Sequence, residues 1–315
     1  MPRPDTPSGD RTKTSAGHRI ELHGHRGARA AMPENTLPGV RAAMEAAVDF
    51  VEIDVVLSAD GIAHVHHDTC LNPSLTRRNA IWLTASDSAL NTLTADQIAA
   101  FDVGASRPGS PERAAFPRQK SVPGTPIPTL HDVITCVGEA RCTAGRSVGL
   151  NIELKSSPID PAAPDPVALA NAVAQALKGH DTRAPIRIQS FDWRALAAMR
   201  RCSHATDLGV ELGVLTCANP AFSTVTPDSA WRADYWPQGI ELFAALADIG
   251  ATIWGPDHHD LTPADVAAAQ TAGMLVSTWT INTAADLDRA LRCGVNAVTT
   301  DDPAWAAREL RHRYG

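Results

Sequence analysis

Two acidic residues interrupt an apolar, β-branched stretch near position 50. Within residues 50–57, Glu52 and Asp54 alternate with valine and isoleucine. Because successive side chains of a strand point to opposite faces, both acids lie on one face of the predicted strand. Two carboxylates on a buried strand cost free energy unless they are ion-paired or bind a metal. Core ion pairs are one explanation; we favour a hard divalent cation, which prefers clustered oxygen ligands.

A third acid occurs in a later strand candidate. In residues 149–155, Glu153 and Lys155 alternate with apolar side chains and so share a face. If both strands line one barrel, Glu52, Asp54 and Glu153 converge near its top, because the active sites of such barrels lie at the C-terminal ends of the strands. Lys155 then either neutralises an anionic ligand or forms a salt bridge at the mouth.

Histidines lie on both sides of this acidic group. His25 follows the first strand candidate, and His67 follows a hairpin strand predicted at 62–66. Histidine is the side chain best suited to proton transfer near neutral pH, and the forked guanidinium of Arg26 suits phosphate. The chain has 12 histidines, so some will lie near the acids by coincidence. We interpret three others as bystanders: His204, His258 and His259.

Composition excludes several classes of protein. The 315 residues carry a net charge of −7, which disfavours a nucleic-acid partner because phosphate binding needs basic patches. No run of about 20 apolar residues indicates a membrane span, and the polar start of the chain shows no secretory leader. None of the six cysteines forms a Cys-x-x-Cys pair. We therefore expect a cytoplasmic protein with a small-molecule substrate; nothing here indicates its oligomeric state.

The elements that must position these residues alternate along the chain. The strand candidates are 20–23, 50–57, 148–154, 186–190, 209–215, 251–254, 274–280 and 296–300. The helix candidates are 37–48, 129–136, 165–178, 192–201, 239–248, 263–272, 284–292 and 303–312. Such alternation predicts an α/β fold with a parallel sheet, and eight units favour a closed (β/α)8 TIM-type barrel. A doubly wound open sheet is the alternative, although no Gly-x-Gly-x-x-Gly motif follows the first strand.

Two stretches depart from this alternation. Residues 1–18 read as a polar tail. Residues from about 69 to 126 are rich in Pro, Ser, Thr and Asn, with one short helix predicted near 94–101, and we interpret them as a small insertion after the second strand. The expected organisation is one catalytic domain, 19–315, that carries this insertion.

Several motifs together resemble one known family. They are His25-Arg26-Gly27, Pro33-Glu34-Asn35-Thr36, Glu52-Ile53-Asp54, Asp60-Gly61 followed by His67-Asp68, Glu153-Leu154-Lys155, Gln189-Ser190-Phe191, Trp279-Thr280-Ile281-Asn282 and Thr300-Asp301-Asp302-Pro303. In this order they resemble the glycerophosphodiester phosphodiesterase family, which adopts a (β/α)8 barrel. Single motifs are weak evidence, but the set is specific and extends from about residue 20 to 303.

The resemblance implies a role for each candidate residue. One divalent metal, Mg²⁺ or Ca²⁺, would be bound by Glu52, Asp54 and Glu153. The general acid and base would be His25 and His67. The substrate would be contacted by Arg26, Lys155, Gln189 and Trp279. His66 is an alternative to its neighbour, but the family's catalytic histidine directly precedes an Asp, which selects His67.

The implied reaction is metal-dependent hydrolysis of a glycerophosphodiester to glycerol 3-phosphate and an alcohol, with water or a glycerol hydroxyl as nucleophile. Alternatives are a lysophospholipase D-like activity, a metal-dependent amidohydrolase that uses His23 and His25, and a non-catalytic binding protein. The chain departs from the family at Asn296 and Ala297 and by an extra acid at 301–302. We expect neither departure to touch the chemistry. The few aromatics of the insertion, such as Phe116, leave the alcohol side undefined.

Overall fold

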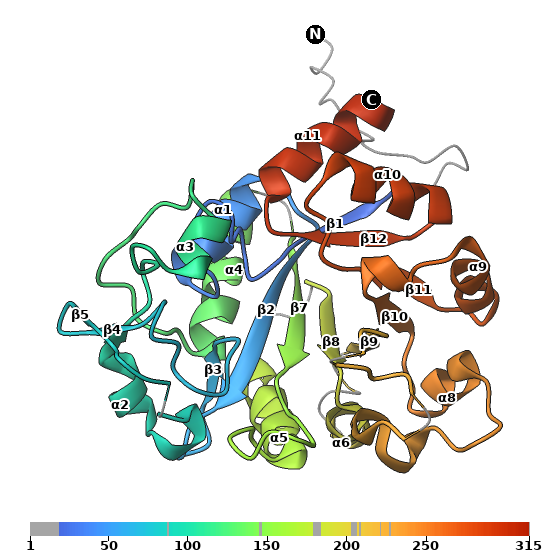
Figure 1. Ribbon diagram of the computed structural model, residues 1–315, viewed down its shortest axis with the longest axis horizontal. Helices are drawn as coiled ribbons and strands as arrows, with labels where there is room; N and C mark the ends of the chain where they lie inside the picture. Colours follow the sequence, from blue (N-terminus) through green and yellow to red (C-terminus); the bar gives the residue numbers. More distant parts are fainter. Residues whose placement is uncertain are drawn as a thin grey trace, which may run out of the picture.

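A closed barrel of parallel strands forms the centre of the computed structural model, which describes residues 19–314 except 87, 145–146, 179–183, 203–206, 208, 221 and 227 (Figure 1). The tail predicted at 1–18 lies outside the described residues. The barrel strands are β1 (Glu21–Gly24), β2 (Phe50–Leu57), β7 (Gly149–Leu154), β8 (Ile186–Ser190), β9 (Glu211–Thr216), β10 (Ile253–Pro256), β11 (Leu275–Thr278) and β12 (Ala297–Thr300). Each pairs in parallel with the next, and β1 pairs with both β2 and β12. This second pairing closes the barrel and excludes the open sheet.

A helix follows every barrel strand. These helices are α1 (Leu37–Glu45), α4 (Leu130–Ala144), α5 (Pro166–Leu177), α6 (Trp193–Arg201), α8 (Leu242–Asp248), α9 (Pro263–Thr271), α10 (Ala284–Cys293) and α11 (Pro303–Tyr314). The predicted (β/α)8 fold is therefore confirmed. The main error in the predicted bounds is α4, which continues for two turns beyond the expected end at 136. Within the described residues, no helix is both long and apolar enough to cross a membrane.

Alternation along the strands separates the core from the site. In β2, Val51, Ile53 and Val55 belong to the main apolar core, which packs the barrel against its helices. The residues between them, Glu52 and Asp54, are equally buried but face the barrel interior. Parallel strands covered on both faces read as nearly continuous apolar runs. Glu52 and Asp54 are therefore exceptions in this strand, and their position in the barrel interior makes them candidate functional residues.

The segment between β2 and α4 carries a small core of its own, at the left of Figure 1. Its elements are β3 (Ala63–Val65), β4 (Arg77–Arg78), β5 (Ile81–Trp82), η1 (Leu90–Thr92), α2 (Ala95–Ala99), β6 (Phe101–Asp102) and α3 (Pro111–Ala115). β3 pairs antiparallel with β2, and β4 pairs with β5 and β6. A second apolar cluster, which includes Leu71 and Ile98, reaches the barrel through Val56. The small sheet was not predicted because two-residue strands are too short to show a period. The division into one catalytic domain with an insertion at 69–126 stays a prediction.

Candidate active site

Three carboxylates converge inside the barrel. Glu52 and Asp54 come from β2 and Glu153 from β7, and the register of these strands places Asp54 beside Glu153. One oxygen of each lies within 4.8 Å of the others, and all three residues are buried. The structure thus brings together the acids that the sequence placed on two strand faces.

The acids of this cluster differ in their electrostatic surroundings. Burial, and then the charges of Asp54 and Glu153, raise the pKa of Glu52 well above its usual value. Burial alone would raise the pKa of Asp54 too, but the nearby guanidinium of Arg26 and other positive groups lower it. Asp54 Oδ1 accepts no hydrogen bond from any residue that the structure describes. An all-oxygen donor set with an unused, buried carboxylate oxygen fits a hard divalent cation.

Lys155 directly follows β7, the strand that carries Glu153. Its Nζ donates to Glu153 Oε1 at 2.7 Å and lies 3.7 Å from Asp54 Oδ1. Burial would lower the pKa of Lys155, but the two carboxylates outweigh it and raise the pKa. Lys155 therefore stays charged. It forms the salt bridge considered from the sequence, and it also lines the cavities described below.

The loop between β1 and α1 wraps around the acids. The backbone N–H of Arg26 donates to Glu52 Oε2 at 2.9 Å, and its guanidinium lies between Glu34 and Asp54. Asn35 donates from Nδ2 to Asp54 Oδ2 at 2.8 Å and accepts the backbone N–H of Asp54. Arg26 and Asn35 both have positive φ, 48° and 54°, which this network of bonds maintains. Glu34 and Asn35 received no role from the sequence, although both lie in a motif that we singled out.

His25 is held by an acid from the far end of the chain. Its Nδ1 lies 2.6 Å from Oδ1 of Asp301, and Oδ2 of the same carboxylate accepts from Asn282 at 2.7 Å. Burial opposes ionisation of Asp301, but the hydrogen bond from His25 and the charges near it lower the pKa to about 2. A carboxylate on Nδ1 fixes the ring and leaves Nε2 for chemistry. The expectation that the acids at 301–302 do not touch the chemistry is therefore wrong for Asp301.

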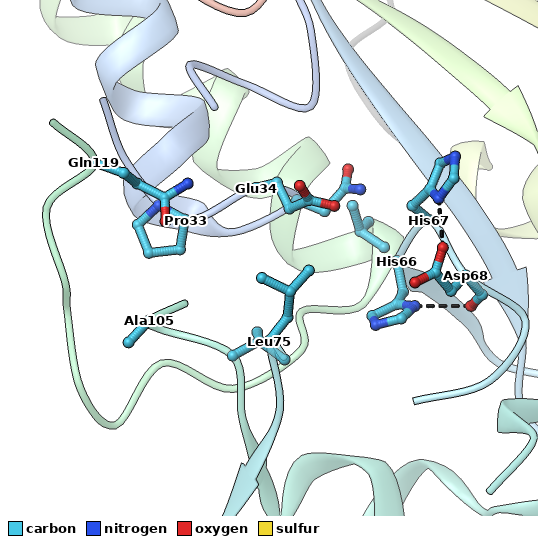
Figure 2. Close-up of a pocket in the computed structure, with 11 residues that line it drawn as sticks. Pro33, Glu34, His66, His67, Asp68, Leu75, Ala105 and Gln119 are labelled. Carbon is cyan, nitrogen blue, oxygen red and sulfur yellow. Dashed lines mark hydrogen bonds and ion pairs between the residues drawn. The ribbon is translucent and has the colours of Figure 1, made fainter. Parts of the chain in front are cut away.

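The two adjacent histidines point in different directions (Figure 2). His67 Nδ1 lies 2.6 Å from Asp68 Oδ1, whereas His66 Nδ1 bonds the backbone oxygen of Asp68 at 2.8 Å. His66 and His67 both line a small pocket between the β1–α1 loop and the inserted segment, and His67 also lines the two larger cavities. Burial, with the charges of Lys155 and Arg26, lowers the pKa of His67 to about 4, so this imidazole is neutral near pH 7.

Two cavities meet at these groups. One, of about 250 Å³, is lined by His25, Arg26 and Gln189 among others, and a second, of about 460 Å³, opens beside it. They share five lining residues: His67, Glu153, Lys155, Phe191 and Trp279. Gln189 also donates to Glu52 Oε1 at 3.4 Å. Arg29 lines the smaller cavity 2.8 Å from Glu34 and had not been singled out from the sequence.

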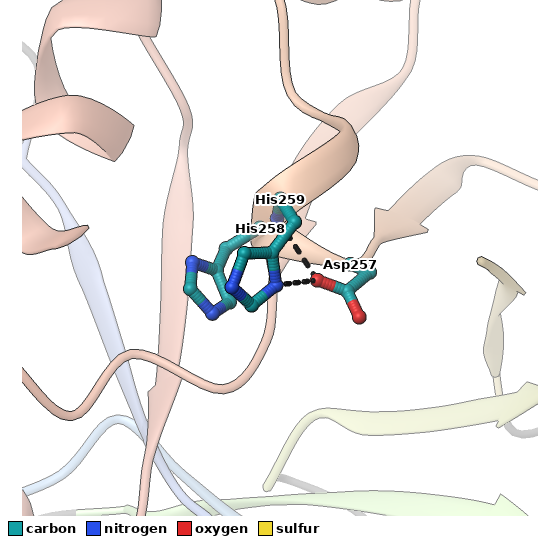
Figure 3. A group of neighbouring side chains, drawn as sticks. All are labelled: Asp257, His258 and His259. Carbon is teal, nitrogen blue, oxygen red and sulfur yellow. Dashed lines mark hydrogen bonds and ion pairs between the residues drawn. The ribbon is translucent and has the colours of Figure 1, made fainter. Parts of the chain in front are cut away.

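A second group of possible ligands lies at the end of β10 (Figure 3). His259 Nδ1 lies 2.9 Å from Asp257 Oδ1, and the guanidinium of Arg289 on α10 approaches His258 Nδ1 to 2.7 Å. A positive charge at that nitrogen opposes metal binding, so we interpret the group as a tie between β10 and α10. The bystander interpretation of His258 and His259 stays, and His204 lies outside the described residues.

The geometry can be compared with known proteins. A sequence model of the glycerophosphoryl diester phosphodiesterase family matches residues 25–305. The chain belongs to this family. The resemblance drawn from the motifs is confirmed, and the chain is an enzyme of the phosphodiesterase class.

Relatives of the glycerophosphoryl diester phosphodiesterase family match along nearly the whole chain. The glycerophosphodiester phosphodiesterase of Caldanaerobacter subterraneus subsp. tengcongensis is 24% identical over 89% of this chain and 93% of its own, and that of Bacillus subtilis is 26% identical over 90% and 84%. The crystal structure of a family candidate from Silicibacter pomeroyi superposes with a TM-score of 0.80 at 30% identity, covering 93% and 94% of the two chains. An Oleispira antarctica phosphodiesterase, solved with its product sn-glycerol-3-phosphate, shares the fold with a TM-score of 0.67 at 23% identity, covering 92% and 96%.

Membership of the phosphodiesterase family also weighs against the amidohydrolase alternative, and so does the position of His23. His23 is fully buried low in the barrel, with Nε2 3.3 Å from Arg187 and its ring against Phe50. Asn151 lies 3.5 Å from its other nitrogen. Both nitrogens of His23 therefore have neighbours, and the ring does not form a metal pair with His25.

Proposed function

We propose that the protein hydrolyses glycerophosphodiesters to glycerol 3-phosphate and an alcohol, with the help of one divalent cation, Mg²⁺ or Ca²⁺. The observation that carries the proposal is the carboxylate cluster of Glu52, Asp54 and Glu153, flanked by two histidines whose Nδ1 atoms are both bonded to acids. Family membership and the product bound by the Oleispira antarctica relative support the substrate class.

Phosphodiester cleavage requires a nucleophile and two proton transfers, which we assign to His25 and His67. A bond forms between phosphorus and the nucleophile, which is water or the neighbouring glycerol hydroxyl, while the bond from phosphorus to the leaving alcohol breaks. One of His25 and His67 accepts the nucleophile's proton, and the other donates a proton to the departing alkoxide. If the glycerol hydroxyl attacks, water then opens the cyclic phosphate with the proton transfers reversed.

Charge on the phosphate is met by fixed positive groups. Arg26 is anchored by Glu34, and Lys155 by Glu153, so neither guanidinium nor ammonium needs to reorganise when substrate binds. The cation, when held by Glu52, Asp54 and Glu153, supplies Lewis-acid stabilisation of the phosphate oxygens. Gln189 and Trp279 line the cavity walls and orient the substrate.

The test is a metal-supplemented assay over a panel of glycerophosphodiesters that measures release of glycerol 3-phosphate. We expect turnover with Mg²⁺ or Ca²⁺ and none after chelation. Lysophosphatidylcholine belongs in the panel with choline release as its readout, because its cleavage yields lysophosphatidic acid instead of glycerol 3-phosphate. Preference for it would favour the lysophospholipase D-like alternative. Absence of turnover on every diester, under conditions where a characterised relative is active, would contradict the proposal.

A further inference from the structure

The larger cavity has an aromatic wall. Phe191, Phe222, Trp231 and Trp279 line it, from the loops that follow β8, β9 and β11. Phe191 packs edge to face on Phe222 and Trp279, with ring centroids 5.1 and 5.4 Å apart, and Phe222 packs on Trp231 at 4.9 Å. Phe191, Phe222 and Trp279 remain partly exposed, so aromatic side chains form part of the cavity surface. These rings come from the segments that follow the barrel strands, not from the inserted segment.

A carboxylate without a positive partner lies in the same cavity. Asp160 accepts hydrogen bonds from the Thr69 hydroxyl at 2.6 Å and from the backbone N–H of Ala162 at 2.9 Å. Across the described ranges, no Lys, Arg or His side chain lies within ion-pair distance of it. Of the other acids of the cavity, Glu153 is paired with the ammonium of Lys155, and Asp68 is bonded to the imidazole of His67. Asp160 therefore adds an uncompensated negative charge.

The smaller cavity has a different character. Its walls include the side chains of Gln189, Ser277, Thr280 and Thr299, which offer hydrogen bonds to hydroxyl groups. The two cavities meet at His67, Glu153 and Lys155. A phosphate at that junction places the polyhydroxyl half of a diester in the smaller cavity. Its other ester group then enters the larger, aromatic cavity.

We propose that the larger cavity is the subsite for the leaving alcohol and selects an alcohol that carries a quaternary ammonium group. This inference rests on the proposed function. Aromatic faces attract weakly hydrated organic cations, and quaternary ammonium ligands are recognised in this way because they offer no N–H to satisfy. Asp160 supplies the opposite charge. A primary ammonium would need several hydrogen-bond acceptors, and a neutral alcohol would leave Asp160 uncompensated.

The first experiment compares substrates that differ only in the alcohol. We expect kcat/KM for glycerophosphocholine to exceed that for glycerophosphoglycerol, and to exceed that for glycerophosphoethanolamine by a smaller factor. In Asp160→Asn, which keeps the shape of the side chain and an acceptor oxygen for the N–H of Ala162, the choline-to-glycerol ratio of kcat/KM should fall about fivefold. Phe222→Leu should lower the same ratio by about the range expected for one cation–π contact, two- to tenfold. Asp96→Asn, an exposed acid outside both cavities, is the matched control and should keep the wild-type ratio.

A binding measurement separates this proposal from the proposed function. Tetramethylammonium should inhibit competitively, and calorimetry should detect its binding to the wild-type protein but much more weakly to Asp160→Asn. Equal kcat/KM for all three diesters, with no change of ratio in either variant, would overturn the subsite while leaving diester hydrolysis standing. If no diester is hydrolysed, the proposed function fails, and tetramethylammonium binding alone then decides whether the aromatic cavity takes a cation.

Discussion

At both histidines proposed for catalysis, a carboxylate bonds Nδ1 and leaves Nε2 for proton transfer. The two acids reach their histidines differently. Asp68 is the next residue after His67, whereas Asp301 reaches His25 from the end of the last barrel strand. In each case the carboxylate orients the imidazole and stabilises its charged form once it has taken a proton.

Removing either imidazole should stop most turnover without disturbing the acids. We expect His25→Ala and His67→Ala each to lower kcat by about 10²- to 10⁴-fold, the usual contribution of a general acid or base. Calorimetric titration with Mg²⁺ or Ca²⁺ should still show binding in both. The control is His259→Ala, an exposed histidine on the η3 turn (His258–Asp260), which should behave as wild type. Near-normal rates in both active-site variants would refute the assignment.

Asp301 should make stability depend on pH in acid. Its pKa is lowered to about 2, below the usual value of 3.8, so its ionised form favours the folded state. This contribution is complete above about pH 5 and is lost as the pH falls through 4 towards 2, amounting to about 1 kcal/mol by pH 3. Urea unfolding of wild type and Asp301→Asn from pH 6 to pH 3 should show a shallower decline in the variant. Parallel curves would show that the carboxylate carries no such linkage.

At the scale of elements, the β1–α1 loop is the part of the structure that shapes the site. It carries Arg26 and Asn35 against the acids of β2, and it folds back tightly on α1. Gly27 has φ of 86°, and a Cβ there would lie 2.6 Å from the carbonyl carbon of Gly39 in α1. The loop can take this course only because Gly27 and Gly39 have no side chains, which lets their backbones come into contact.

Gly27→Ala should therefore cost far more than its conformational strain. Gly61 is a matched control, because its φ of 79° is similar but a Cβ there meets nothing within 4 Å. We expect Gly61→Ala to lower the free energy of unfolding by about 1 kcal/mol, the cost of a left-handed alanine. Gly27→Ala should lower it by about 3 kcal/mol or more and should also reduce kcat/KM, because α1 must shift. Equal losses in chemical denaturation would contradict the close approach.

At the scale of the whole molecule, closure of the barrel forces the acids together. Neighbouring parallel strands place Asp54 and Glu153 side by side, although about 100 residues of chain separate them. Their mutual repulsion opposes folding and is relieved when a cation binds. The folded state should then bind divalent cations far better than the unfolded chain.

Metal removal should therefore affect stability as well as activity. With cation at 100 times its dissociation constant, linkage predicts a gain of about 2.7 kcal/mol and a higher Tm than after chelation. Glu153→Gln should lose most of this shift in thermal melting, because the site loses a charged ligand. Identical melting with Mg²⁺, with Ca²⁺ and with chelator, together with full activity after chelation, would remove the cation from the scheme.

Features that depend on local periodicity were predictable from the sequence. The alternation in β2 and β7 indicated that Glu52, Asp54 and Glu153 face away from the apolar core, and the alternation of strands and helices indicated the barrel that brings them together. The motif rule that chose His67 over His66 agrees with the cavities that each ring lines.

Features that depend on contacts between distant segments were decided only by the tertiary structure. The pairing of His25 with Asp301 spans 276 positions. The hydrogen bonds between Asn35 and Asp54 need a positive φ at Asn35, which the periodicity of the sequence does not indicate. The aromatic wall is assembled from three separate loops, so the sequence alone singled out Trp279 but did not group it with Phe222 and Trp231. The alternation of side chains along a strand is set by its own backbone and can be predicted from the local sequence. The partner of a side chain depends on how the strands and loops of the closed barrel are arranged in space.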